Sequence, residues 1–279
     1  MATFGAIWRE NKHFGFLIFV LFSVGLLPLL LWDRVAFFLM IKQWNHPIVD
    51  GIAPYITHLG NGATYLFWVF ILVLDLLYYA IHRANLCLEL LPNDPTRLTY
   101  AVLTGSIAPQ GSKANKKSIG LPPTKAEKVL IWGSSFGCMF IVVQFLKRVV
   151  FPYVVRPMEL LSREEVHVVD GVKLFTELSF PSGHAGTIFT MITVIQLLQP
   201  KKSWFRTIGL ALLACVVAYS RIYLCHHFYT DVYFGALIGT VAACIGYHLS
   251  TYFCLAYWLD RSIYFLWIKY GKALLFFKK

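Results

Sequence analysis

The sequence predicts an all-α membrane protein whose helices form one bundle across the bilayer. Residues of the AVILMFWYC set make up 58% of the 279 residues, and charged residues make up only 14%. Soluble domains average roughly 45–50% apolar and about 25% charged residues. Six apolar stretches approach the roughly 20 residues that a helix needs to cross the hydrocarbon core. These observations exclude a disordered chain, a coiled coil and an ordinary soluble domain.

The predicted spans are 14–32, 64–81, 129–146, 185–199, 207–224 and 232–258. No cleavage-site pattern follows the first span, so it is interpreted as a retained helix and not as a signal peptide. The fourth span is short and is expected to extend upstream through a polar turn. We expect a single membrane domain over 1–279, divided into 1–63 (first span and outer segment), 64–128 (second span and inner loop), 129–258 (catalytic core) and 259–279 (basic tail).

The distribution of lysine and arginine predicts the orientation. The net charge is +11, and most of the basic residues lie at the two ends and in 82–128 and 201–206. Cytoplasmic connections are rich in Lys and Arg, so both ends are predicted to be inside. Segment 33–63 is then outside, as an amphipathic helix on the surface, and 259–279 is an interfacial anchor. Topology explains the basic charge better than a nucleic acid partner, and none is predicted.

Three polar clusters stand at predicted outer ends of spans, where charge is costly and therefore indicates function. They lie in 147–157, 179–184 and 220–231. The charge-based topology places all three on one face of the membrane. The clusters were not used to derive that topology, so their agreement indicates a common site.

The second cluster contains Pro181, Ser182, Gly183 and His184, a sequence typical of a helix start. Ser182 is a good N-cap, and Gly183 allows close backbone approach. Free N–H groups and the helix dipole at such a terminus favour an anion. His184, on the first turn, is positioned to give a proton to a leaving group.

The third cluster pairs His227 with Asp231, four residues later. On a helix these residues share a face. A carboxylate bonded to one imidazole nitrogen fixes the tautomer and leaves the other nitrogen as a nucleophile or base. Arg221 adds a planar fork for phosphate-type oxygens.

The first cluster supplies further cations. Arg156, followed by Pro157, is interpreted as an anion-binding residue, whereas Arg148 is interpreted as a residue that extends to the membrane surface. Zinc ligation by His226, His227, Asp231 and His184 was considered, but adjacent histidines point apart on a helix. A divalent metal also favours more carboxylates, so a phosphoryl group held by fixed positive charge is the preferred ligand and no metal is predicted.

The second and third clusters resemble two signature motifs of the type 2 phosphatidic acid phosphatase superfamily. Those motifs are Pro-Ser-Gly-His, here 181–184, and Ser-Arg-x5-His-x3-Asp, here 220–231. The superfamily contains membrane lipid phosphatases and shares its active-site architecture with vanadium-dependent haloperoxidases. The resemblance implies a phosphatidic acid phosphatase type 2-like core within the six-helix bundle.

The first motif departs from the family pattern of Lys, six residues and Arg-Pro. Val149 occupies the expected lysine position, and eight residues separate Lys147 from Arg156. A bulge around Phe151 and Pro152 would return Lys147 to the site; alternatively, Arg148 substitutes for it.

The resemblance implies a metal-independent, cofactor-free phosphoryl transfer. His227 would form a phosphohistidine, Asp231 would hold its imidazole, and His184 would act as general acid and then as base. The phosphoryl oxygens would be bound by Lys147, Arg156, Ser182, Gly183 and Arg221. The expected substrate is a lipid phosphate or pyrophosphate: phosphatidic acid, phosphatidylglycerophosphate, undecaprenyl pyrophosphate or a lipid A type.

Two other functions remain open at the level of the sequence. A lipid phosphotransferase would use the same phosphohistidine, and an anion transporter would use the cations without chemistry. The expected location is the bacterial inner membrane, with the active site on the periplasmic side and membrane lipids as neighbours. The sequence gives no oligomeric state.

Overall fold

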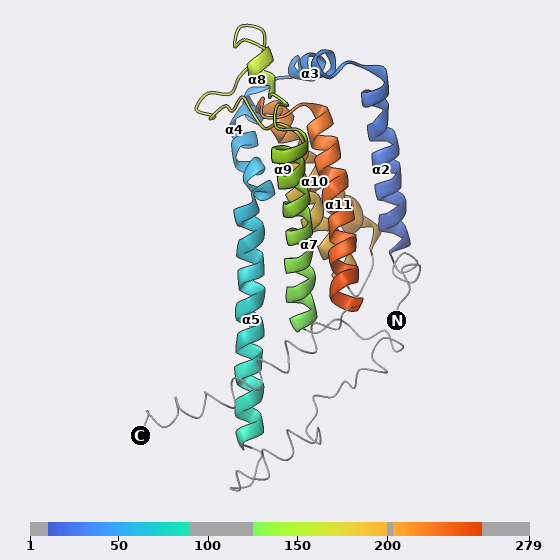
Figure 1. Cartoon of the computed structure of the whole chain (residues 1–279), viewed down its shortest axis with the longest axis vertical. Helices are drawn as coiled ribbons and strands as arrows, with labels where there is room; N and C mark the ends of the chain where they lie inside the picture. The colour runs from blue at the N-terminus through green and yellow to red at the C-terminus, as the bar shows by residue number, and fades with distance from the viewer. Residues whose placement is uncertain (1–10, 90–124, 200–202, 253–279) are drawn as a thin grey trace.

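The computed structural model describes residues 11–89, 125–199 and 203–252, which are mainly helical and contain no strand. The elements in chain order are α2 (Lys12–Leu31), α3 (Arg34–Lys42), α4 (Pro47–Ile56), the 3₁₀ helix η1 (Thr57–Gly60), α5 (Gly62–Glu89), α7 (Lys125–Phe145), the π-helical turn η3 (Leu146–Val150), α8 (Pro157–Leu160), α9 (Gly183–Leu198), α10 (Trp204–Tyr223) and α11 (Tyr229–Tyr252). Long helices run side by side, and the short helices α3 and α8 gather at one end (Figure 1). The predicted all-helical membrane fold is confirmed.

Five of the described helices are long and apolar enough to cross a membrane: α2, α5, α7 with η3, α10 and α11. The remaining predicted span corresponds to α9, which has 16 residues and falls short of that length. The predicted count of six spans is therefore not confirmed, and α9 lies in the interior of the bundle. Residues 185–194 of α9 are all buried, because α7, α10 and α11 pack around it.

Threonines on α9 illustrate how a buried helix accommodates polar side chains. Thr187, Thr190 and Thr193 each donate a hydrogen bond to the backbone carbonyl four residues earlier, at 2.7–2.9 Å. A buried hydroxyl without a partner would cost free energy. These bonds satisfy the hydroxyls within the helix itself.

Glycines on α11 set its distance from the neighbouring helices. A methyl group added at Gly235 would collide with the Ser182 carbonyl oxygen, and one at Gly239 would collide with that of Gly186. Small residues at helix interfaces allow close backbone approach inside membranes. The start of α11 is thereby held against the start of α9, where two of the three polar clusters lie.

Two expectations about connections differ from the structure. Helix α5 continues to Glu89 instead of ending at 81, so the predicted inner loop 82–128 begins later; its part 90–124 and the tail 259–279 lie outside the described residues. The outer segment 33–63 contains two helices and a 3₁₀ turn in place of one helix. The break falls where His46 caps α4 and Pro47, which suits a first helical position, starts it.

Candidate active site

His227 and Asp231 lie at the corner between α10 and α11. His227 precedes α11, and Asp231 is in its first turn, so the pair is not on one continuous helix as the spacing suggested. The imidazole Nδ1 is 3.4 Å from Asp231 Oδ2, and both side chains are almost fully buried. Asp231 Oδ2 also accepts hydrogen bonds from Phe228 N at 3.0 Å and Ser179 Oγ at 2.5 Å. The carboxylate is thereby fixed on the Nδ1 side, which leaves His227 Nε2 as the nitrogen available for chemistry.

The start of α9 lies directly beside this pair. Ser182 is the N-cap, as predicted, and its hydroxyl accepts from Ala185 N. Its own backbone N–H donates to the Asp231 carbonyl at 2.9 Å, so the two helix starts are joined through their main chains. The dipole and free N–H groups of α9 therefore point to the His227 corner.

Arg221 is in the last turn of α10 and is 4% exposed. One guanidinium nitrogen donates to Thr57 Oγ1 at 2.6 Å. Its Nε is buried and has no hydrogen-bond partner among the described residues. Since an unpaired buried donor is costly, this guanidinium is suited to an anion that supplies an oxygen.

Arg156 is half-buried and is fixed by backbone carbonyls. Its Nε donates to Glu177 O at 2.8 Å, and its terminal nitrogens donate to His226 O at 2.9 Å and Leu178 O at 3.4 Å. The guanidinium has five N–H donors, so these contacts orient it without consuming all of them. The segment 158–178, which follows Arg156 and Pro157, thus ends in carbonyls that hold this arginine against the His227 corner.

Lys147 is partly buried, whereas Arg148 is exposed. The chain from Leu146 to Val150 forms a π-helical turn, in which Phe151 N donates to Leu146 O at 2.8 Å. A π-turn takes more residues per turn than an α-helix, which accommodates part of the extra spacing to Arg156. Lys147 is half-buried and within electrostatic range of Arg156, Asp231 and Arg221. Arg148 is exposed and bonds Gln144 at 3.0 Å.

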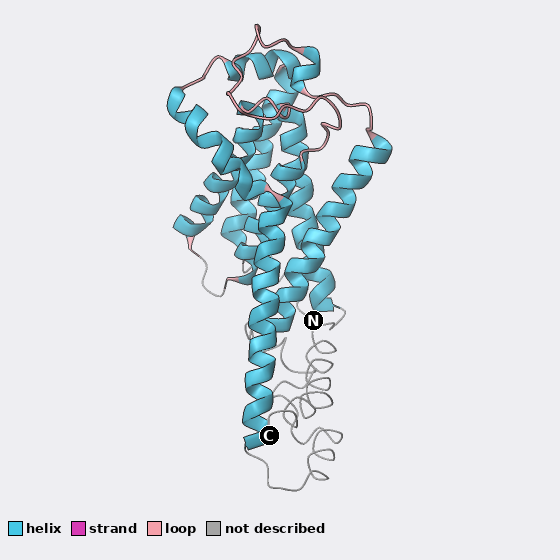
Figure 2. Cartoon of the chain, turned by 90° about the vertical axis from the view of Figure 1, so that its left-hand side faces the viewer, coloured by secondary structure: helices cyan, strands magenta, loops and turns pink. Residues whose placement is uncertain are grey.

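His184 completes the group of charges. It is half-buried on the first turn of α9, within electrostatic range of Arg221, His226, Lys147 and Arg156. Gly60 of η1 packs against it so closely that an added methyl group would lie 2.9 Å from its carbonyl oxygen. The predicted site residues are therefore at one end of the bundle. Loop 161–182, the longest loop between described helices, lies at the same end (Figure 1 and Figure 2).

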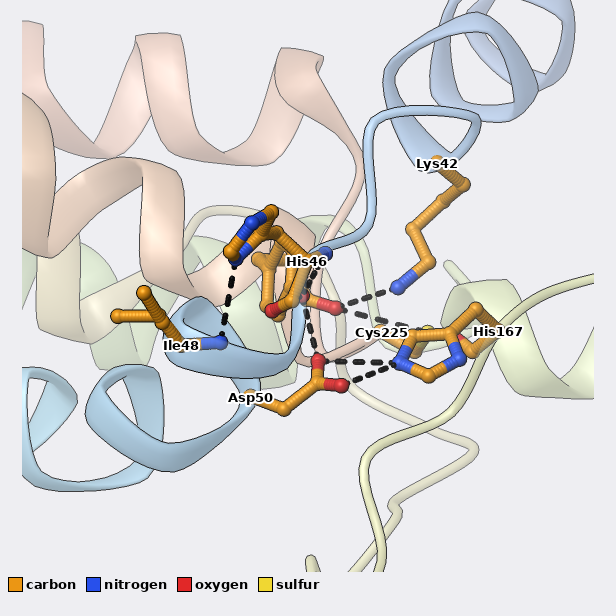
Figure 3. Close-up of polar contacts among 7 residues, drawn as sticks. Lys42, His46, Ile48, Asp50, His167 and Cys225 are labelled. Carbon is orange, nitrogen blue, oxygen red and sulfur yellow. Dashed lines mark hydrogen bonds and ion pairs between the residues drawn. The ribbon is translucent and has the colours of Figure 1, made fainter.

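A second polar network supports the corner from outside (Figure 3). Lys42 Nζ of α3 donates to the Tyr223 carbonyl at the end of α10, at 2.6 Å. Asp50 of α4 accepts from the Tyr223 hydroxyl at 2.5 Å and lies 3.0 Å from His167 Nε2. The Tyr223 hydroxyl, and then His167, hold the pKa of Asp50 below its usual value. The outer helices and loop 158–178 are thus tied to the end of the helix that carries Arg221.

Three contributors to the site were not assigned by sequence reasoning: Ser179, Thr57 and His226. Ser179 lies inside the second cluster but gives no signal of its own, and Thr57 is far from every motif in sequence. Ser179 is identified by its bond to Asp231 and Thr57 by its bond to Arg221, whereas His226 is identified by its backbone carbonyl, which accepts from Arg156. Within the described ranges, no group of three or more His, Cys, Asp or Glu is arranged to hold a metal, and metal independence stays a prediction.

The fold and this arrangement define a helical membrane protein with a buried cationic site around two histidines. Residues 128–254, which include all three clusters, match the family model of the PAP2 superfamily. This match over 128–254 supports the predicted resemblance to the type 2 phosphatidic acid phosphatase superfamily.

Two solved structures are similar. One is LpxE from Aquifex aeolicus, with 23% identity, a TM-score of 0.47, and 76% of this chain and 92% of that chain covered. The other is a transmembrane PAP2-type phosphatidylglycerolphosphate phosphatase from Bacillus subtilis, with 18% identity, a TM-score of 0.46, and coverage of 91% and 96%. A comparison with curated proteins gives no match.

Proposed function

We propose that this protein hydrolyses a lipid phosphate or pyrophosphate through a phosphohistidine on His227. The observation that carries the proposal is the orientation of this imidazole. Its Nδ1 side is occupied by Asp231, and the buried Arg221 nearby has an N–H donor without a partner. A nucleophile oriented by a carboxylate and surrounded by preorganised cations is the arrangement that phosphoryl transfer requires.

In the first step, His227 Nε2 attacks phosphorus. An N–P bond forms, the bond from phosphorus to the leaving oxygen breaks, and His184 donates the proton that the leaving group takes. Arg221, Arg156 and Lys147 stabilise the charge that develops on the phosphoryl oxygens. General acid catalysis typically contributes about 10²–10⁴-fold in rate, and a single preorganised donor about 10²–10³-fold.

In the second step, water attacks the phosphohistidine. His184, now neutral, takes a proton from the water, the N–P bond breaks and inorganic phosphate forms. His227 returns to its starting state with Asp231 still on its Nδ1 side. Ser182 and the Gly183 N–H, at the start of α9, bind the same oxygens in both steps. The positive charges present make a metal or other cofactor unnecessary in this mechanism.

The location of the site favours a lipid substrate. It lies at the end of the apolar bundle, where a headgroup can reach the cations while its acyl chains stay in the bilayer. Phosphatidic acid, phosphatidylglycerophosphate, undecaprenyl pyrophosphate and a lipid A phosphate all meet this requirement. The positive-inside pattern favours a site on the periplasmic side of a bacterial inner membrane. Labelling of a Tyr153→Cys variant by a membrane-impermeant maleimide in intact cells tests that side, since Tyr153 is 92% exposed.

The decisive experiment measures phosphate release from short-chain lipid phosphates by the purified protein in detergent. His227→Ala is expected to lower release at least 10³-fold, because the nucleophile is lost. His58→Ala is the matched control, since His58 is exposed on η1 at the same end. Equal release by wild type and His227→Ala would refute the proposal, and anion flux without hydrolysis would indicate a transporter. Transfer of a labelled phosphoryl group from the donor lipid to an added acceptor lipid would indicate a phosphotransferase.

A further inference from the structure

His226 has a buried nitrogen that the proposed mechanism does not use. The residue is 6% exposed and lies in the corner between α10 and α11. Its Nε2 is 3.0 Å from the Lys173 carbonyl oxygen, whereas its Nδ1 is buried with no hydrogen-bond partner in the described part of the chain.

The Lys173 contact determines which nitrogen carries the proton. A carbonyl oxygen only accepts hydrogen bonds, so Nε2 must be the donor. In a neutral ring, Nδ1 is then an acceptor. Burial, followed by the charge of Arg221, lowers the pKa of His226 to about 4, so the ring is neutral near pH 7. The site therefore contains an unpaired acceptor among several cations.

The neighbours of His226 place this acceptor in the phosphoryl site. The ring is within electrostatic range of His184, His227, Arg221 and Arg156, and its own carbonyl accepts from Arg156 at 2.9 Å. The buried Nε of Arg221 is an unpaired donor in the same region. One ligand satisfies both atoms only if it offers an acceptor oxygen and an O–H donor.

We infer that His226 Nδ1 accepts a hydrogen bond from a hydroxyl group held in the phosphoryl site, an inference that rests on the proposed function. Two sources share this chemistry: the P–OH of a singly protonated phosphate ester, and the water that attacks the phosphohistidine. A fully ionised oxyanion would face the Nδ1 lone pair with acceptors only. His226 is thus a binding residue that selects a protonated ligand in a site of fixed positive charge.

Two substitutions separate this role from loop anchoring. His226→Gln can place its amide N–H near the Nε2 position, which keeps the Lys173 bond and removes the acceptor at Nδ1. His226→Asn can place its amide oxygen near the Nδ1 position, which keeps the acceptor and loses the Lys173 bond. We expect His226→Gln to lower the rate about tenfold, as for one lost hydrogen bond, and His226→Asn to lower it less. The loss falls on kcat/KM if the hydroxyl is P–OH, and on kcat if it belongs to the attacking water, because hydrolysis of the phosphohistidine follows release of the leaving group.

Inhibition by inorganic phosphate and sulfate distinguishes the two sources. If the hydroxyl is P–OH, His226→Gln weakens inhibition by phosphate but not by sulfate, which carries no O–H. If the hydroxyl belongs to the attacking water, both inhibition constants stay unchanged, and phosphohistidine accumulates because its hydrolysis slows. Either pattern supports the inference.

Other outcomes overturn it. Wild-type kinetics in His226→Gln, or a loss in His226→Asn equal to or larger than that in His226→Gln, would show that His226 only anchors the loop. If His226→Gln does not fold, as judged by its melting temperature, His226→Asn decides alone: a loss of more than tenfold overturns the inference. Failure of the proposed function is distinguishable, because wild type itself would then release no phosphate.

Discussion

At the scale of single residues, the chemistry of the site depends on which atom of each side chain is already engaged. Asp231 Oδ2 accepts hydrogen bonds from the Ser179 hydroxyl and the Phe228 N–H, and it lies 3.4 Å from His227 Nδ1. A terminal nitrogen of Arg221 is hydrogen-bonded to Thr57, whereas its Nε has no partner within the described ranges. The protein thus fixes each group on the side away from the proposed substrate, which is how an active site is preorganised.

Ser179→Ala tests that arrangement. The substitution removes a hydrogen bond to a carboxylate, which is worth roughly 1.5–3 kcal/mol, and leaves Asp231 less well oriented. We expect kcat to fall about 10–100-fold with little change in KM, since Ser179 does not contact the proposed substrate. Steady-state kinetics measure the effect. Ser134→Ala is a control, because Ser134 bonds α11 near Gly246, and a similar loss there would contradict the assigned role.

The environment of His227 predicts an acid-resistant enzyme. Burial, and then the charges of Arg156 and Arg221, hold its pKa well below the ordinary histidine value. Attack requires the neutral ring, so lowering the pH toward 6.5 does not remove the nucleophile. The acid limb of kcat/KM, which reports the free enzyme, is expected below pH 6.5. A pH–rate profile in which His227 titrates at or above its ordinary value of about 6.5 would contradict this.

At the scale of elements, the distance between helix starts controls the site. The proposed nucleophile precedes α11, the proposed phosphate-binding turn opens α9, and Arg221 lies in the last turn of α10. The Ser182 N–H bond to the Asp231 carbonyl fixes the first two. The 3₁₀ helix η1 contacts α10 through Thr57 and α9 through Gly60. Short elements at this end of the bundle therefore align the long ones.

Gly239→Ala is expected to disturb this alignment. The added methyl group would collide with the Gly186 carbonyl of α9, and overpacking typically costs about 1–3 kcal/mol. Thermal unfolding in detergent should show a lower melting temperature, together with reduced phosphate release. Gly209→Ala on α10 is the control, since nothing lies within 4 Å of its added methyl group. Equal stability of the two variants would disprove tight α9–α11 packing as the cause.

At the scale of the whole molecule, a bundle of apolar helices holds the partly or fully buried cations of the proposed site at one end. Helices α2 and α5 are mostly exposed along their spanning windows, as expected for surfaces that face lipid. The site is instead built by α7, α9, α10 and α11 with the outer network of Figure 3. This separation lets the outer surface adapt to lipid while the inner helices hold the charges.

Metal removal tests the source of the positive charge. If lysine and arginine replace a metal, EDTA should leave phosphate release unchanged within experimental error, because three side chains already supply fixed cations. The assay is phosphate release before and after dialysis against chelator. Loss of activity with EDTA and its return with Zn²⁺ or Mg²⁺ would overturn metal independence.

Much of the fold was predictable because it follows from properties local in sequence. Low charge and long apolar stretches predict membrane helices, and Ser182 followed by Gly183 predicts the start of α9. The ends of α5 and the break before α4 were missed, since helix ends depend on contacts as well as on propensity. The spacing of His227 and Asp231 predicted that the two residues pair. In the structure they do so at the corner between α10 and α11, and not along one helix.

The sequence by itself determined the class of protein and the residues proposed to carry the chemistry. Only the tertiary structure decided that Lys147 is partly buried while Arg148 is exposed, that Ser179 bonds Asp231, and that Nδ1 of His226 has no hydrogen-bond partner among the described residues. Composition and motif spacing are properties of residues that are close together in the sequence. These three facts depend instead on a π-turn and on hydrogen bonds between residues distant in sequence. Such contacts exist only when the helices are packed.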